Sequence, residues 1–144
     1  MRSSRGLMLL VAAGTMLVAG AGCRRSIGQG PTPSSPVPLF VENHGYLDVA
    51  VYAMRSASGP HTRLGTVTGL SKMQVVVPYT ELQSGGTLML YLHAIGSAGS
   101  WVSPSVMVSA DDAAVLEIYA DASGDLSRSV LYTTILGDKI PGVR

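Results

Sequence analysis

Three histidines, His44, His61 and His93, are the first candidates for metal binding or acid–base chemistry. Each is far along the chain from any second histidine or cysteine that would give the short ligand spacing typical of a zinc site. We expect His44 at a strand end, His61 in a turn and His93 on the outward face of a strand. The sequence therefore predicts no metal site and no bound cofactor at these residues.

The carboxylates give two further candidates, and neither has a complete motif. The segment 121–125, DASGD, is similar to the start of a calcium-binding loop, but an EF-hand would then require glutamate where the chain has Tyr132. A β-turn explains this segment without a metal. Asp111 and Asp112 are explained in the same way, as the entry to a turn, although adjacent carboxylates in a loop could also bind calcium weakly.

Motifs for nucleophilic or phosphate chemistry are missing from the sequence. Residues 69–73, GLSKM, lack the second glycine of a nucleophile elbow, and the Gly/Ser loop 96–100 is not followed by Lys-Ser or Lys-Thr. Nothing in the spacing of the glutamates selects a pair for glycoside cleavage from Glu42, Glu81 and Glu117. The interpretation is that the chain is not an enzyme.

Aromatic residues are the remaining candidates for ligand or partner contact. Trp101 adjoins the Gly/Ser loop, and Tyr52 and Tyr91 fall on the outward alternation of their strands. Exposed aromatic rings can form a platform for sugars or a protein contact. The alternative is that the tryptophan belongs to the core and that the tyrosines cover sheet edges.

The elements that would position these residues are short segments in which apolar and polar residues alternate. This period of two is typical of half-buried strands. In the segment 87–95 it places Leu88, Leu90, Leu92 and Ala94 toward the core. Strands are expected at 39–44, 46–52, 63–68, 72–77, 87–95, 101–109 with a break at Pro104, 113–120 and 129–136.

About eight strands joined by Gly, Pro and Ser turns predict an all-β fold, a single antiparallel Greek-key β-sandwich. A small closed barrel is the alternative. The chain has 144 residues, a formal net charge of +1 and 13% charged residues. Because it has no basic stripe, the sequence predicts no nucleic-acid partner.

The N-terminus has the pattern of an export signal. Arg2 and Arg5 precede an uncharged apolar run at 7–22, which is short for a membrane span. The run ends in Ala21, Gly22 and Cys23, and this resembles the lipobox of a bacterial lipoprotein, although Gly20 stands where leucine is usual. The alternative is ordinary signal peptidase cleavage after an A-x-A site at 19–21, which would release the protein.

The lipoprotein resemblance implies that residues 1–22 are removed and that Cys23 is acylated. Two or more acyl chains hold a protein firmly at a membrane, whereas one chain anchors it marginally. The residue after the cysteine is Arg24, not the aspartate that retains lipoproteins at the inner membrane. The resemblance therefore implies attachment to the outer membrane, on its periplasmic face, with the lipid on Cys23 as the membrane contact.

The domain organisation follows from the changes in composition. Residues 23–38 are rich in Pro, Ser and Gly and predict an extended linker. The sandwich is expected at 39–136, and 137–144 is expected to be a loose tail.

Three segments, DVAVY at 48–52, RLGTV at 63–67 and WVSP at 101–104, are similar to a type of small bacterial lipoprotein with no assigned activity. That resemblance implies a sandwich but no reaction. We therefore expect a lipid-anchored cell-envelope protein with a non-catalytic binding or structural role, whose partners are envelope proteins or glycans. A carbohydrate- or peptidoglycan-binding module is the alternative, and an envelope enzyme is the third hypothesis.

The lipid anchor gives a direct prediction about mass and location. In a bacterial host, the membrane-extracted chain should have the mass of residues 23–144 plus acyl chains, measured by intact-protein mass spectrometry. The Cys23→Ser variant should lose these chains and leave the membrane fraction. A mature chain without added acyl groups would contradict lipidation.

Overall fold

The computed structural model describes residues 35–137. Its regular elements are strands joined by turns, with one short 3₁₀ helix. They are β1 (Val37–Asn43), β2 (Val49–Met54), β3 (His61–Val67), β4 (Lys72–Val77), η1 (Tyr79–Glu81), β5 (Thr87–Leu88), β6 (Leu90–Ala94), β7 (Ser100–Val102), β8 (Val106–Met107), β9 (Asp112–Ile118) and β10 (Val130–Ile135).

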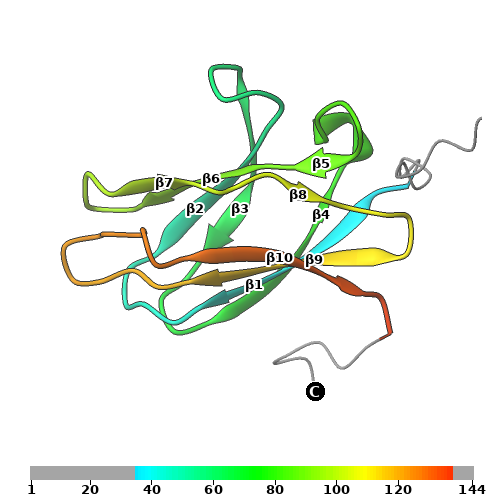
Figure 1. Ribbon diagram of the computed structural model, residues 1–144. Helices are drawn as coiled ribbons and strands as arrows, with labels where there is room; N and C mark the ends of the chain where they lie inside the picture. The colour runs from blue at the N-terminus through cyan, green and yellow to red at the C-terminus, as the bar shows by residue number, and fades with distance from the viewer. Residues whose placement is uncertain (1–34, 138–144) are drawn as a thin grey trace, which may run out of the picture.

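The strands form two four-stranded sheets that pack face to face, with a small third sheet beside them (Figure 1). We call the sheet with strand order β10-β9-β1-β4 sheet A, and the sheet with order β3-β2-β6-β7 sheet B. The short strands β5 and β8 pair with each other. The predicted all-β sandwich is confirmed. Its pairings are antiparallel except for one, because β1 and β9 run parallel in the middle of sheet A.

The core lies between the two sheets and is built from the inward positions of the alternating strands. Leu88, Leu90, Leu92 and Ala94 are fully buried, as the alternation predicts. Leu39 and Leu116 face them from sheet A and are also fully buried. Burying a side chain of this size contributes roughly 1.5–3 kcal/mol, so the alternation is the main energetic reason for the two layers.

Three local features differ from the sequence-based expectation. The expected strand 87–95 is divided at Met89, and its two parts join different sheets, because β5 pairs with β8 and β6 pairs with β2 and β7. The inward alternation continues across the division, so it could not reveal the change of partner. His61 begins β3 instead of lying in the turn. β1 begins at Val37, and Pro38 already pairs with Val76.

A buried asparagine connects the end of β1 to two turns. The Asn43 side chain is 2% exposed, and its Nδ2 donates to the carbonyl oxygens of Leu47 at 2.8 Å and Thr68 at 3.2 Å. Its Oδ1 accepts a 2.9 Å hydrogen bond from the Gly45 N–H. A Cβ added at Gly45 would lie 2.6 Å from the Ala120 carbonyl oxygen, so this turn is held close to the end of β9. Asn43 therefore fixes the chain that follows β1.

Replacing Asn43 with alanine should test this connection. The Asn43→Ala change leaves the Gly45 N–H and the Leu47 carbonyl without their side-chain partner, while the Thr68 carbonyl keeps its bond from Ser71. This loss should lower the free energy of unfolding by about 1–3 kcal/mol. Urea denaturation measures the loss. The control is Ser71→Ala, which removes an exposed hydroxyl that donates to the same Thr68 carbonyl and should cost less than about 0.5 kcal/mol. Equal losses in both variants would show that Asn43 has no special role.

Candidate functional site

Polar side chains gather on the outer face of sheet A, where β1 and β9 run side by side. Glu42 lies opposite Glu117 in the register of the parallel pair. Their neighbours in sequence, such as Val41, Leu116 and Ile118, point inward and are buried, so both glutamates face outward. Two carboxylates are therefore adjacent on one surface, supplied by strands that are far apart in sequence.

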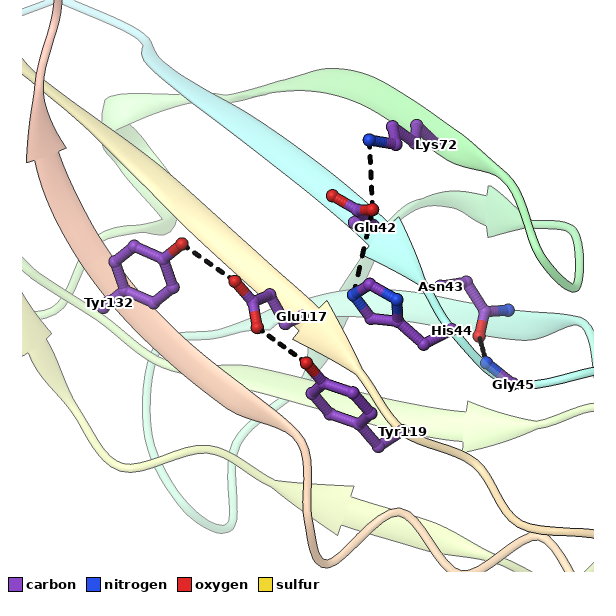
Figure 2. Close-up of polar contacts among 8 residues, drawn as sticks. All are labelled: Glu42, Asn43, His44, Gly45, Lys72, Glu117, Tyr119 and Tyr132. Atoms are coloured by element: carbon purple, nitrogen blue, oxygen red, sulfur yellow. Dashed lines mark hydrogen bonds and ion pairs between the residues drawn. The ribbon is translucent and has the colours of Figure 1, made fainter. Parts of the chain in front are cut away.

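Glu117 accepts hydrogen bonds from two tyrosines, as Figure 2 shows. The Tyr119 hydroxyl donates to Oε2 at 3.0 Å, and the Tyr132 hydroxyl donates to Oε1 at 3.0 Å. Both carboxylate oxygens are thus engaged by phenol groups from β10 and from the end of β9. This arrangement makes Glu117 a fixed acceptor within the protein.

The carboxylate also changes the ionisation of both phenols. Burial and the hydrogen bond to Glu117 raise the pKa of Tyr132 to about 12. The hydrogen bond to Glu117, followed by burial and the negative charge of Glu117, raises the pKa of Tyr119. Ionising either phenol would remove the proton that it donates to Glu117 and would place a second negative charge beside the carboxylate. Both tyrosines therefore stay protonated across the physiological pH range.

His44 extends this group at the end of β1. Its imidazole ring stacks on the Tyr119 ring, with centroids 4.7 Å apart and planes inclined by 10°. Its Nε2 lies 3.9 Å from Glu42 Oε1, and the same oxygen lies 3.0 Å from Lys72 Nζ (Figure 2). The predicted position of His44 at a strand end is confirmed.

A small cleft of about 220 Å³ opens beside the stacked rings. Residues from the end of β9 and from the loop before β10 complete its lining, which consists of His44, Tyr119, Ala120, Asp121, Asp125 and Arg128. The cleft thus combines one aromatic stack with two carboxylates and one guanidinium.

The two aspartates of the cleft are held by their own loop. Asp121 Oδ1 accepts hydrogen bonds from Ser123 Oγ at 2.6 Å, the Ser123 N–H at 2.8 Å and the Asp125 N–H at 2.9 Å. The Ser123 hydroxyl bond, together with the backbone N–H of Asp125, lowers the pKa of Asp121. Asp125 accepts from the N–H and hydroxyl of Ser127. The loop is therefore ordered by its own carboxylates, as the β-turn interpretation of this segment requires.

Arg128 differs from the two aspartates because its guanidinium makes no hydrogen bond or ion pair with another residue in the range 35–137. An arginine side chain offers five N–H donors in a planar arrangement. The cleft therefore has donors available to a ligand as well as acceptors.

Tyr52 and Tyr91, two of the aromatic residues singled out in the sequence, lie together on the outer face of sheet B. Their ring centroids are 5.8 Å apart, and His61 joins them at 6.4 Å from Tyr52 and 4.8 Å from Tyr91. We call these three residues the sheet B aromatic group. Their planes are inclined by 32–56°, so the rings do not form a flat platform.

Trp101, the third aromatic candidate, does not belong to this group. It pairs with Leu92 across β6 and β7, which places it on the inward side, and it packs partly buried against the core. This position agrees with the alternative given in the sequence analysis, in which the tryptophan belongs to the core. His93 is half-buried in β6, and its neighbours Leu92 and Ala94 are buried inward, so it faces outward as expected.

Sequence reasoning did not find the cleft. Its parts are separated by more than seventy positions, and only the parallel pairing of β1 with β9 brings them together. The alternation of each strand did contain one signal of these polar pairs. It places Glu42 and His44 on the same outward face of one strand, and Glu117 and Tyr119 on the same outward face of another.

Cys23 and the predicted signal segment at 1–22 lie outside the described residues, as do most of the linker and most of the tail. Within residues 35–137, no group of three or more His, Cys, Asp or Glu side chains is arranged to hold a metal ion. The same part of the chain contains no helix that is long and apolar enough to cross a membrane.

Comparison with known proteins gives little further information. The sequence matches no protein-family model and no curated protein. The structure aligns with the NMR structure of a protein from Eubacterium rectale at a TM-score of 0.41 and 11% identity, covering 74% of this chain and 94% of that chain. At this TM-score the likeness carries no argument about function.

The phenol–carboxylate group predicts a pH dependence of stability at alkaline pH. The pKa of Tyr132 is about 12 in the folded chain against about 10 when unfolded. Between these values the folded state holds a proton that the unfolded state has released. The contribution of Tyr132 to the free energy of unfolding should therefore be fully present below pH 10 and should be lost as the pH rises toward 12. Denaturant midpoints measured across this range test the fall.

The Tyr132→Phe variant should show a smaller decrease, because it has no phenol to ionise at this position. Tyr46→Phe is the control, since Tyr46 is 84% exposed and lies outside the group. The same alkaline decrease in wild type and Tyr132→Phe would contradict the role assigned to the Tyr132 hydroxyl.

Proposed function

We propose that this chain is a non-catalytic binding domain, held at the bacterial outer membrane by lipid on Cys23, which binds a saccharide unit of an envelope glycan in the sheet A cleft. The observation that carries the proposal is the combination of a stacked ring pair with both hydrogen-bond donors and acceptors around one small cleft. The anchor rests on the lipobox-like residues before Cys23.

The chemistry of the cleft suits an uncharged polyhydroxy ligand. A sugar hydroxyl can accept from Arg128 and donate to a carboxylate oxygen of Asp121 or Asp125, while the C–H face of a sugar ring can pack on an aromatic ring. With two carboxylates and one guanidinium, the cleft disfavours a strongly anionic ligand. A volume of about 220 Å³ is below the 300–1,000 Å³ of typical drug-sized sites, so it suits one sugar-sized group.

The state of the nearby carboxylates supports binding over hydrolysis. Glycoside cleavage requires two carboxyl groups free to act on opposite sides of the bond. Glu117 has both oxygens engaged by phenols, and Glu42 is paired with Lys72 at 3.0 Å. These contacts make the pair a rigid support for His44 and Tyr119.

The sheet B aromatic group is a second candidate surface for the same ligand class. Tyr52, His61 and Tyr91 offer aromatic area close together. However, their rings are tilted, and the cleft lies on the other sheet. The binding experiment therefore includes variants of both surfaces.

The test measures binding to soluble peptidoglycan fragments and to an array of bacterial glycans. Arg128→Ala should weaken binding by about tenfold or more, which corresponds to ~1.4 kcal/mol, because it removes the unengaged donor of the cleft. Arg55→Ala is the matched control, since Arg55 is an exposed arginine in the turn after β2. It should bind as wild type does.

A second matched pair tests the competing surface. Tyr91→Ala removes one ring of the sheet B aromatic group, and Tyr46→Ala removes an exposed tyrosine outside both surfaces. Binding that is lost in Tyr91→Ala and retained in Arg128→Ala would move the site to sheet B. Absence of binding to every glycan would overturn the saccharide proposal.

A further inference from the structure

β10 forms one edge of sheet A, and within residues 35–137 it leaves a row of backbone groups without a strand partner. It pairs with β9 on one side, and the Leu136 N–H donates to the Asp111 carbonyl in the same register. Since the residues of an antiparallel strand alternate in the direction of their hydrogen bonds, the even-numbered residues of β10 bond to β9. The N–H and C=O groups of Leu131, Thr133 and Ile135 therefore point to the open edge.

The other edges of the two four-stranded sheets carry features that discourage pairing with a further strand. β7 spans three residues and is soon followed by Pro104. β3 contains Arg63 and a register irregularity opposite β2. β4 begins with Lys72 and is followed by Pro78. Charges, prolines, bulges and short length are the usual protections of an edge strand.

β10 has none of these protections. The segment 129–136, SVLYTTIL, contains no charged residue and no proline, and its register with β9 continues without a shift. It also exposes apolar side chains, because Val130 is 47% exposed, Ile135 is 60% exposed and Leu136 is 52% exposed. An uncharged and regular edge of this length is a template for another strand.

We infer that two copies of this chain pair through β10, antiparallel and centred on Thr133. In this register Leu131 lies opposite Ile135 of the second copy, and Thr133 lies opposite its own counterpart. Each of these pairs exchanges two hydrogen bonds through β10 groups that have no strand partner within the described part of one chain. The pairing is self-complementary, as a two-fold interface requires.

The same register brings the exposed apolar residues together, and this favours a second copy over an unrelated strand. On the outer face, Val130 lies opposite Leu136 of the second copy in a non-hydrogen-bonded pair, where side chains are closest. On the inner face, the exposed Ile135 lies opposite Leu131 of the second copy, which is 6% exposed and buried against the core. The pairing joins two four-stranded sheets into one continuous sheet.

Charge substitution at the facing positions tests both the pairing and its register. The full chain is measured in density-matched detergent micelles by sedimentation equilibrium. Wild type should form a dimer, and Val130→Lys or Leu136→Lys should weaken it by about tenfold or more, because each places a charge against an apolar side chain. Both positions are exposed, so the variants should fold as wild type does.

Combining Val130→Lys with Leu136→Glu should restore the dimer, because lysine then faces glutamate across the interface twice. Val76→Lys is the matched control, since Val76 is 56% exposed on β4 at the opposite edge of the same sheet, and it should leave the dimer unchanged. A wild-type chain that stays monomeric at every concentration would overturn the inference. So would a dimer that is insensitive to both lysine substitutions, or one that the charge pair does not restore.

Discussion

The parallel pairing of β1 with β9 is the constraint on which the polar surface of this protein depends. Asn43 lies opposite Ile118 at the end of that pair, and the His44 N–H donates to the Ile118 carbonyl at 2.8 Å. The residues that follow the two strands, His44 and Tyr119, are therefore brought into ring contact. The cleft is built on that contact, and the Asn43 side chain fixes the backbone beneath it.

The sequence predicted the layers of the fold because burial repeats along each strand. The alternating residues Leu88, Leu90, Leu92 and Ala94 identify an inward face without any knowledge of the neighbouring strands. Alternation does not identify the partner of a strand, so it could not show that residues 87–88 and 90–94 join different sheets. It also could not show that β1 runs parallel to β9.

The candidate site was harder to predict for the same reason. Tyr52 and Tyr91 were recognised as outward residues, and their contact follows from their direct pairing across β2 and β6. The sequence selected no carboxylate pair from Glu42, Glu81 and Glu117. Tyr119 shares the outward parity of Glu117, but the second phenol, Tyr132, reaches Glu117 only through the pairing of β10 with β9. The cleft depends on pairing between distant strands, and a local pattern contains no information about such pairing.

The proposed saccharide site and the proposed self-pairing edge belong to the same sheet. The cleft is completed by the loop between β9 and β10, and β10 itself carries the open edge. A pair of chains joined at β10 would carry two clefts on one continuous sheet. If the chain is held at a membrane surface as proposed, two sites on one support would strengthen attachment to a repeating glycan by raising the effective concentration of the second site.

The central claim is that the cleft beside His44 and Tyr119 is the ligand site. The most direct measurement is a series of ¹H–¹⁵N correlation spectra recorded while disaccharide-peptide fragments of peptidoglycan are added. The account predicts that the largest amide shifts occur at residues 44–45 and 119–128, with little change around Tyr52 and Tyr91. Shifts concentrated on the sheet B aromatic group, or no shifts at saturating fragment, would contradict it.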